Sequence, residues 1–141
     1  MIIKQLSVFL ENKSGRLSEV SDLLGQAGIN MSAFSIADTS DFGILRVIVS
    51  DPEKALDLLK KNNFSSSLTE VICLICPNEP GALAKALKIL DKADVQIEYM
   101  YAFSINETAN IVIRPTNVQK CIETLQEHEI ELMKSSDLYK L

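Results

Sequence analysis

The chain repeats itself with a period of 66 residues, because adding 66 to a residue number aligns its two halves without a gap. Self-similarity at a fixed period indicates copies of one structural unit. Identical residues recur in the turns and in the apolar stripes: Asn12 and Asn78, Gly15 and Gly81, Leu17 and Leu83, Leu24 and Leu90, Ala27 and Ala93, Lys54 and Lys120, Leu59 and Leu125. A chain of 141 residues is long enough for two small domains. We predict these domains over residues 1–68 and 69–141.

Each copy has the same predicted order of elements. Strands are expected at 6–10, 29–36, 44–49 and 65–69, and in the second copy at 72–76, 95–103, 110–113 and 132–136. Helices are expected over 17–27, 53–61, 83–93 and 116–125, where apolar residues recur at helical spacing. The order βαββαβ, twice, predicts an α+β fold of two tandem ferredoxin-like units, each an antiparallel sheet with both helices on one face.

Capping residues in the sequence predict where the helices begin and end. Ser14 is expected to cap the first helix and Pro80 to lie in the first turn of its counterpart. Asp51 and Thr116 are expected to open the second helix of each copy. Gly28 and Asp94 follow the first helices, where a left-handed residue ends a helix.

Composition excludes several classes of function. The chain is 47% hydrophobic and 23% charged, which is typical of a globular protein, and no apolar run approaches the roughly 20 residues of a membrane span. The net charge of −5 disfavours binding to nucleic acid or to an anionic membrane. The N-terminus lacks the pattern of a signal peptide, so we expect a cytoplasmic protein with three reduced cysteines.

Two glycine turns join a first strand to a first helix, at residues 12–17 and 78–83. A glycine lets a ligand approach the main chain, and a helix start presents unpaired N–H groups that suit a carboxylate. The side chains of Asn12 and Asn78 can donate to a carboxylate or accept from an ammonium group. Asn, Pro and Gly also make a good turn without any ligand. Finding the turn at the same point of both copies favours binding.

These residues resemble the ACT domain family, small regulatory modules with this strand order that often bind amino acids. The resemblance covers nearly the whole chain as two tandem units. It depends on residues 78–83 followed by 93–97, and on the looser version at 12–17 followed by 27–31. Residues 98–103 continue the likeness to stand-alone tandem ACT proteins that have no attached enzyme.

In the family, a ligand lies between the glycine turn of one unit and the start of the second strand of a neighbouring unit. The resemblance therefore implies ligand-binding residues in both copies: Asn12, Gly15, Arg16, Leu17, Asn30 and Met31, and Asn78, Glu79, Gly81, Ala82, Leu83, Gln96 and Ile97. Lys13 and Ser14 stand where the second copy has Glu79 and Pro80, so the two turns differ in charge. Whether both bind stays open.

Other motifs carry weaker signals. Cys73 and Cys76 are three apart on a strand and face opposite ways, so we predict no metal site. Tyr99 and Tyr101 share a strand face that suits either an interface or a pocket. His128, the only histidine, is expected at a solvated helix end.

We therefore expect a non-catalytic, allosteric sensor of a free amino acid that needs no cofactor. A homodimer is expected because paired small sheets cover their exposed edges, and a regulated protein is a further partner. A protein-interaction module without a ligand is the main alternative. Acylphosphatases share the fold and use an arginine near the first loop, so Arg16 makes an enzyme of that kind a second alternative.

Overall fold

The computed structural model describes residues 1–11, 13–38 and 41–141, and these divide into two compact units. The first unit consists of Lys4–Thr69 with Ser136–Leu141, and the second of Met1–Ile3 with Glu70–Ser135. Each unit therefore holds one copy of the repeat together with a short segment from the other end of the chain. The domain boundary between residues 68 and 69 remains a prediction.

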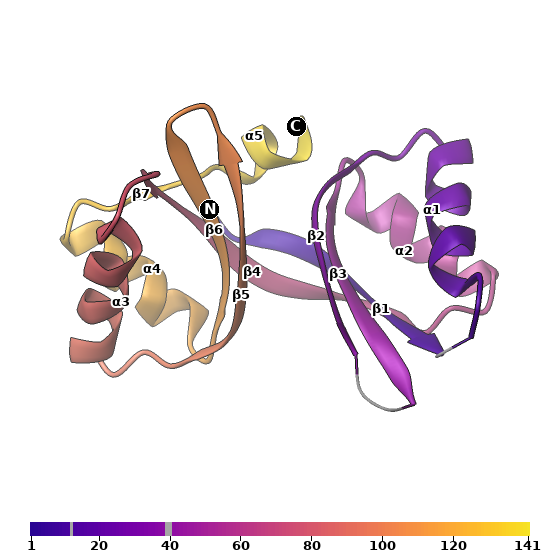
Figure 1. Cartoon of the computed structure of the whole chain (residues 1–141), viewed down its shortest axis with the longest axis horizontal. Helices are drawn as coiled ribbons and strands as arrows, with labels where there is room; N and C mark the ends of the chain where they lie inside the picture. The colour runs from indigo at the N-terminus through magenta and orange to yellow at the C-terminus, as the bar shows by residue number, and fades with distance from the viewer. Residues whose placement is uncertain (12, 39–40) are drawn as a thin grey trace. The chain divides into compact units, whose positions relative to one another are not determined.

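The first unit is an antiparallel sheet covered by helices on one face (Figure 1). Its sheet has the order β2-β3-β1. The chain at the start of β4 lies on the other side of β1, where Phe9 N donates to Ser65 O over 2.9 Å. Its elements are β1 (Ile3–Glu11), α1 (Arg16–Gln26), β2 (Met31–Asp38), β3 (Phe42–Val49), α2 (Pro52–Lys61) and the start of β4 (Ser66–Pro77).

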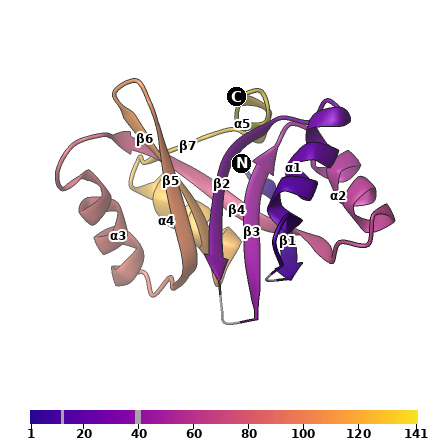
Figure 2. The ribbon, with the colours of Figure 1, turned by 45° about the vertical axis from the view of Figure 1, so that its right-hand side comes forward.

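The second unit repeats this arrangement, with α3 and α4 on one face of a sheet in the order β5-β6-β4-β7 (Figure 2). Its elements are the rest of β4, α3 (Ala82–Lys92), β5 (Ile97–Ile105), β6 (Thr108–Pro115), α4 (Val118–Glu127) and β7 (Glu131–Leu132). The predicted βαββαβ order, antiparallel pairing and one-sided helices are therefore confirmed.

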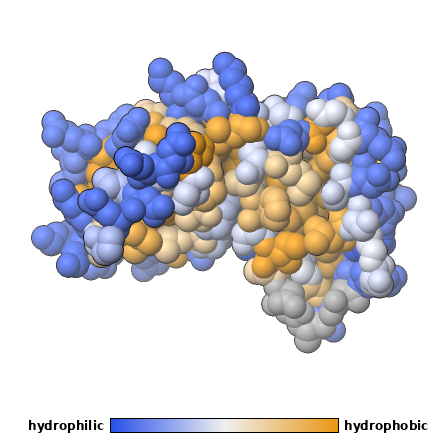
Figure 3. All heavy atoms as spheres, turned by 45° about the horizontal axis from the view of Figure 1, so that its top comes forward, coloured by the Kyte–Doolittle hydropathy of each residue, from blue (hydrophilic) through white to orange (hydrophobic). Residues whose placement is uncertain are grey.

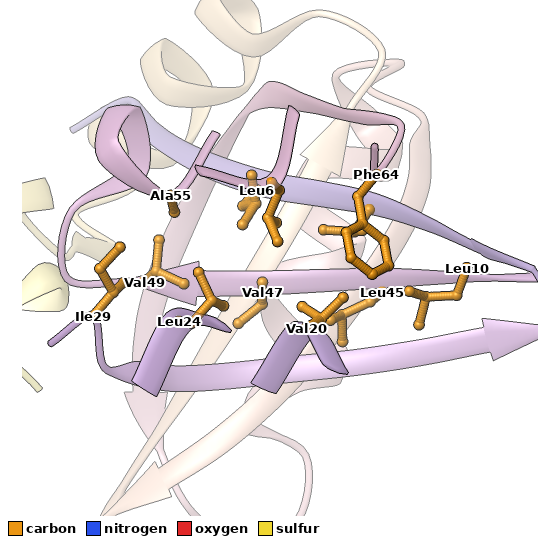
Figure 4. Close-up of a cluster of buried hydrophobic side chains, with 12 residues drawn as sticks. Leu6, Leu10, Val20, Leu24, Ile29, Leu45, Val47, Val49, Ala55 and Phe64 are labelled. Atoms are coloured by element: carbon orange, nitrogen blue, oxygen red, sulfur yellow. The ribbon is translucent and has the colours of Figure 1, made fainter. Parts of the chain in front are cut away.

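Each unit has its own hydrophobic core between sheet and helices. The first core gathers apolar side chains from β1, α1, β3 and α2 (Figure 4): Leu6, Val8, Leu10, Val20, Leu24, Ile29, Leu45, Val47, Val49, Ala55, Leu59 and Phe64. The second core uses equivalent positions and includes Cys121, which is fully buried. Alternating strand residues and helical i, i+4 residues thus bury one face of each element.

The helix ends confirm some predicted caps and correct others. Asp51 accepts from Lys54 N at the start of α2, and Gly28 (φ 73°) and Asp94 (φ 57°) follow their helices in the left-handed conformation. Asn117, not Thr116, caps α4, because the Asn117 side chain accepts from Lys120 N. Ser14 and Pro80 precede the N-cap glycines Gly15 and Gly81, so neither has its predicted role.

Two strand predictions were wrong. The strands expected at 65–69 and 72–76 are one continuous strand, β4. The strand expected at 132–136 ends at Leu132, and Ser135–Tyr139 forms a short helix, α5, that buries Leu138 completely. Tyr139 Oη accepts from Lys4 N over 2.8 Å and ties this end segment to the first unit. None of the described helices is both long enough and apolar enough to cross a membrane.

Candidate functional site

The two glycine turns have the same backbone conformation. Gly15 has φ 88° and ψ −8°, Gly81 has φ 88° and ψ −14°, and the helix begins at the next residue in both units. This left-handed conformation favours glycine over residues with a side chain. A Cβ atom at either position would meet no atom within 4 Å, so open space lies in front of the main chain. The glycine is needed for its backbone angles.

In the described part of the chain, the first turns of α1 and α3 contain backbone donors without an acceptor. Glu19 N donates to Gly15 O and Lys85 N to Gly81 O, over 2.9 and 3.0 Å. Among the described residues, no backbone or side-chain acceptor caps the N–H groups of Leu17 and Ser18, nor those of Leu83 and Ala84. Free N–H groups and the helix dipole at each turn are suited to a carboxylate.

Charged side chains surround the first turn. Lys13 Nζ lies 2.9 Å from Glu11 Oε2, and Arg16 lies 3.7 Å from Glu11 Oε1 and 3.2 Å from Glu19 Oε2. A hydrogen bond from Lys13, followed by the charges of Lys13 and Arg16, holds the pKa of Glu11 below its usual value. The Arg16 guanidinium is therefore already engaged by two carboxylates, which argues against the anion-binding role of the acylphosphatase alternative.

The second turn has a different set of polar groups. Glu79 and Pro80 are exposed there, and no ion pair of Glu79 occurs within the described part of the chain. Asn78 is held by the β5–β6 hairpin, because its N–H donates to Glu107 O over 2.9 Å and its Nδ2 to Ser104 Oγ over 3.4 Å. Asn12, its counterpart, lies outside the described residues.

Each unit has a cleft behind its glycine turn, at matching positions of the repeat. The cleft in the first unit has a volume of about 290 Å³ and that in the second about 390 Å³. In the first, the Arg16 guanidinium carbon lies 5.2 Å from the centroid of the Phe64 ring. The second unit has the smaller Ala82 and Ile130 at these positions, which is in line with its larger volume.

The loop after the second helix of each unit lines these clefts, and sequence reasoning missed it. Residues 63–65 contribute in the first unit and 129–131 in the second. Asn63 (φ 65°) and Glu129 (φ 57°) both adopt the left-handed conformation. The two loops are equivalent under the 66-residue shift, and each directly follows a predicted helix. This equivalence is the feature of the sequence that could have identified them.

The predicted turn residues do gather in cavities. Arg16 and Leu17 line a cavity of about 220 Å³ together with Ile36 of β2 and Gly43 of β3. Glu79 and Ala82 line the 390 Å³ cleft, and Gly81 lines a groove of about 690 Å³ along α3. Leu83 is half-buried and packs against the second core.

The predicted second-strand residues lie at the opposite end of the helix from their own glycine. An 11-residue helix separates the two, which is about 16 Å. A ligand on a glycine turn therefore cannot also reach the start of the second strand of the same unit, where the predicted residues lie.

The second strands begin with the same irregularity. β2 has a bulge between Met31 and Ala33, and β5 has one between Ile97 and Tyr99, at matching positions. Met31 and Ile97 pack against the cores of their units. Bulges of this kind turn a side chain away from the regular alternation.

The polar residues that precede these bulges are held differently. Asn30 Nδ2 donates to Leu141 O over 2.8 Å, and Ser32 Oγ donates to the same oxygen over 3.1 Å. Gln96 O accepts from Thr116 N over 2.9 Å. The main-chain bond is common to both residues, because Asn30 O accepts from Ser50 N over 3.0 Å, and they differ in the Asn30 side chain, which binds Leu141 O.

The cysteines behave as apolar residues. Burial raises the pKa of Cys73 to about 12 and that of Cys121 to about 11, and it also raises the pKa of the more exposed Cys76. The described residues contain no group of three or more His, Cys, Asp or Glu side chains placed to hold a metal ion. His128 is the exposed C-cap of α4, with Nδ1 2.8 Å from Thr124 O.

The fold and the paired turns define a tandem ferredoxin-like protein with a glycine N-cap at the first helix of each unit. The family model described as an ACT domain pair matches residues 1–141, so the chain belongs to the ACT domain pair family. This membership confirms the resemblance seen in the sequence and supports a ligand-binding, regulatory role.

Three known proteins illustrate the relationship. The protein BT0572 from Bacteroides thetaiotaomicron, whose crystal structure is known, is 57% identical with a TM-score of 0.97 over 100% of this chain and 98% of that one. The ligand-free regulatory subunit of aspartate kinase from Thermus thermophilus shares the fold, with 13% identity and a TM-score of 0.65 over 89% and 93% of the two chains. The acetolactate synthase small subunit of Buchnera aphidicola subsp. Baizongia pistaciae is 41% identical over 44 residues, which cover 31% of this chain and only 28% of that protein.

Proposed function

We propose that this chain is a non-catalytic, cytoplasmic regulatory protein that binds a free amino acid at its glycine turns and acts as a homodimer on a protein partner. The observation that carries the proposal is the pair of glycine N-caps, both at φ 88°, that leave helix N–H groups uncapped among the described residues. The regulatory and small subunits among the similar proteins support a regulatory role.

The second turn is the stronger site in this proposal. The ligand carboxylate accepts hydrogen bonds from the N–H groups of Leu83 and Ala84, where the helix dipole favours negative charge. Its ammonium group is bound by the exposed carboxylate of Glu79 and by the Asn78 side-chain oxygen. At the first turn the nearby carboxylates of Glu11 and Glu19 are already paired with Arg16, so less negative charge is free for an ammonium group.

The start of a second strand forms the opposite wall of the site. Because each helix keeps a turn and the start of its own second strand about 16 Å apart, that wall comes from a neighbouring unit. The residues concerned are Asn30 and Met31, or Gln96 and Ile97. Binding then favours one assembly over others, which is how a small ligand acts as a regulatory signal.

A thermal-shift screen of the twenty amino acids tests this proposal. A ligand at about 100 times its Kd adds roughly 2.7 kcal/mol to the free energy of unfolding, which is an easily measured shift. Gly81→Ala places a methyl group in front of the stronger turn and should reduce the shift, whereas Gly25→Ala, on the exposed surface of α1, should keep it. A chain that no amino acid stabilises would instead support the interaction module without a ligand.

A further inference from the structure

The outward face of α3 carries a stripe of lysines. Lys85, Lys88 and Lys92 are three and four residues apart, so they lie on one face of the helix, and all three are exposed. They line the groove of about 690 Å³ that begins at Gly81, and partly buried Ile89 lines it beside them. The stripe is basic although the chain as a whole has a net charge of −5.

The matching face of α1 has the opposite charge. The 66-residue shift places Glu19, Asp22 and Gln26 at the positions of the three lysines, and these residues are also exposed. The apolar neighbours are alike, since Leu23 stands at the position of Ile89 and both are partly buried. The two faces therefore occupy equivalent positions of the repeat and differ in charge.

The three lysines form no direct ion pair within the described residues, although Lys85 shares a cleft with Glu79, Glu129 and Glu131. Among the described residues, no hydrogen bond or ion pair of the three lysine side chains is found. On α1, Glu19 is paired with Arg16 over 3.2 Å, so the free negative charge of the face comes from Asp22, whose carboxylate accepts from the neutral Gln26 Nε2 over 2.9 Å. Three neighbouring cations repel one another, so an acidic surface is the partner that they favour.

We infer that the acidic face of α1 in one copy of the chain packs against the lysine face of α3 in a second copy. This inference rests on the dimer of the proposed function but not on its ligand. Like faces repel, so α1 against α1 and α3 against α3 are disfavoured. A dimer with two-fold symmetry makes the contact twice, because each copy carries both helices.

Exposed apolar residues beside α1 add to this interface. Leu17 (42% exposed), Phe34 (59%) and Ile36 (46%) lie at or near the first turn and on edge strand β2, and Leu17 and Ile36 line one cavity. Figure 3 shows hydrophobic surface over β2 and β3 on this face. An exposed apolar cluster rimmed by charges is typical of an interaction site. Each contact also brings the partner's helix next to a glycine turn.

Charge reversal at one matched pair tests the inference. Sedimentation equilibrium without any amino acid measures the dimer Kd of the wild type, Asp22→Lys and Lys88→Glu. Each single reversal places like charges face to face and should weaken the dimer at least about 10-fold. An equimolar mixture of the two variants should form a heterodimer more tightly than either variant pairs with itself. In the heterodimer, one contact joins the two substituted residues and the other joins the two unchanged residues. Both contacts therefore pair opposite charges. Asp57→Lys and Lys61→Glu on α2 make the same charge changes away from the interface and should leave the Kd unchanged.

Three results would overturn the inference. If the wild-type protein is a monomer, the dimer and its proposed interface are both refuted. The amino-acid site is then tested separately by the thermal-shift screen. Single reversals that dimerise as well as the wild type would assign the lysine groove to some other occupant. A mixture without preferential heterodimer would show that Asp22 and Lys88 do not face each other.

Discussion

Replacing glycine by alanine should have opposite effects at Gly81 and at Gly25. Gly81 has φ 88°, a conformation that costs a residue with a side chain about 1–2 kcal/mol. Gly25 lies within α1, where alanine is more favourable than glycine by about 0.5–1 kcal/mol. A Cβ atom meets no atom within 4 Å at either position, so neither substitution adds a clash or a contact. The backbone conformation alone therefore determines that Gly81→Ala lowers the free energy of unfolding and that Gly25→Ala raises it.

Urea denaturation followed by far-UV circular dichroism measures this difference. Gly81→Ala should lower the midpoint and Gly25→Ala should raise it, both at an unchanged m value. Gly81→Asn should lose less stability than Gly81→Ala, because asparagine visits the left-handed region more readily. If Gly81→Ala were as stable as the wild type, the left-handed N-cap, and with it the open helix start, would be refuted.

Three further predictions concern caps, thiols and packing. Asp51→Ala should lower the free energy of unfolding by about 1 kcal/mol in urea, because Lys54 N loses its acceptor; an unchanged midpoint would contradict the cap. Burial raises the pKa of Cys73 to about 12, so stability should be fully retained below about pH 8.5, the unfolded value, and fall as the pH rises from there toward 12. Cys73 should accordingly resist alkylation in the folded protein at pH 8, as mass spectrometry would show, and rapid labelling would argue against its burial. Leu90→Ala should cost about 2–5 kcal/mol in calorimetry or urea, because this fully packed side chain leaves a cavity, and a cost under about 1 kcal/mol would contradict that packing.

The repeat made most of the fold predictable. Two copies of one apolar pattern support each other, so the order of strands and helices and the core positions followed from the sequence alone. Local chemistry was sufficient where one side chain decides the structure: Asp51 has an oxygen that caps a helix, and Gly28 and Asp94 tolerate positive φ.

The wrong predictions fall at segments where two or more local backbone structures are close in free energy. Ser14 has a good capping side chain, but Gly15 takes the N-cap position and has no side chain with which to cap the helix. Residues 132–136 contain short polar residues that suit a helix start as well as a strand end, and burial of Leu138 selects helix α5. The sequence pointed to the turns, but the lining of the clefts by residues 63–65 and 129–131 depends on tertiary packing. No local pattern contains that information.

A nuclear magnetic resonance titration of backbone amides tests the central claim most directly. The probe is the amino acid that gives the largest thermal shift, added to uniformly ¹⁵N-labelled protein. We predict that the largest amide shifts occur at Leu83 and Ala84, whose N–H groups lack acceptors among the described residues, with Leu17 and Ser18 following if the first turn also binds. Saturable shifts that leave all four of these amides unmoved would contradict it.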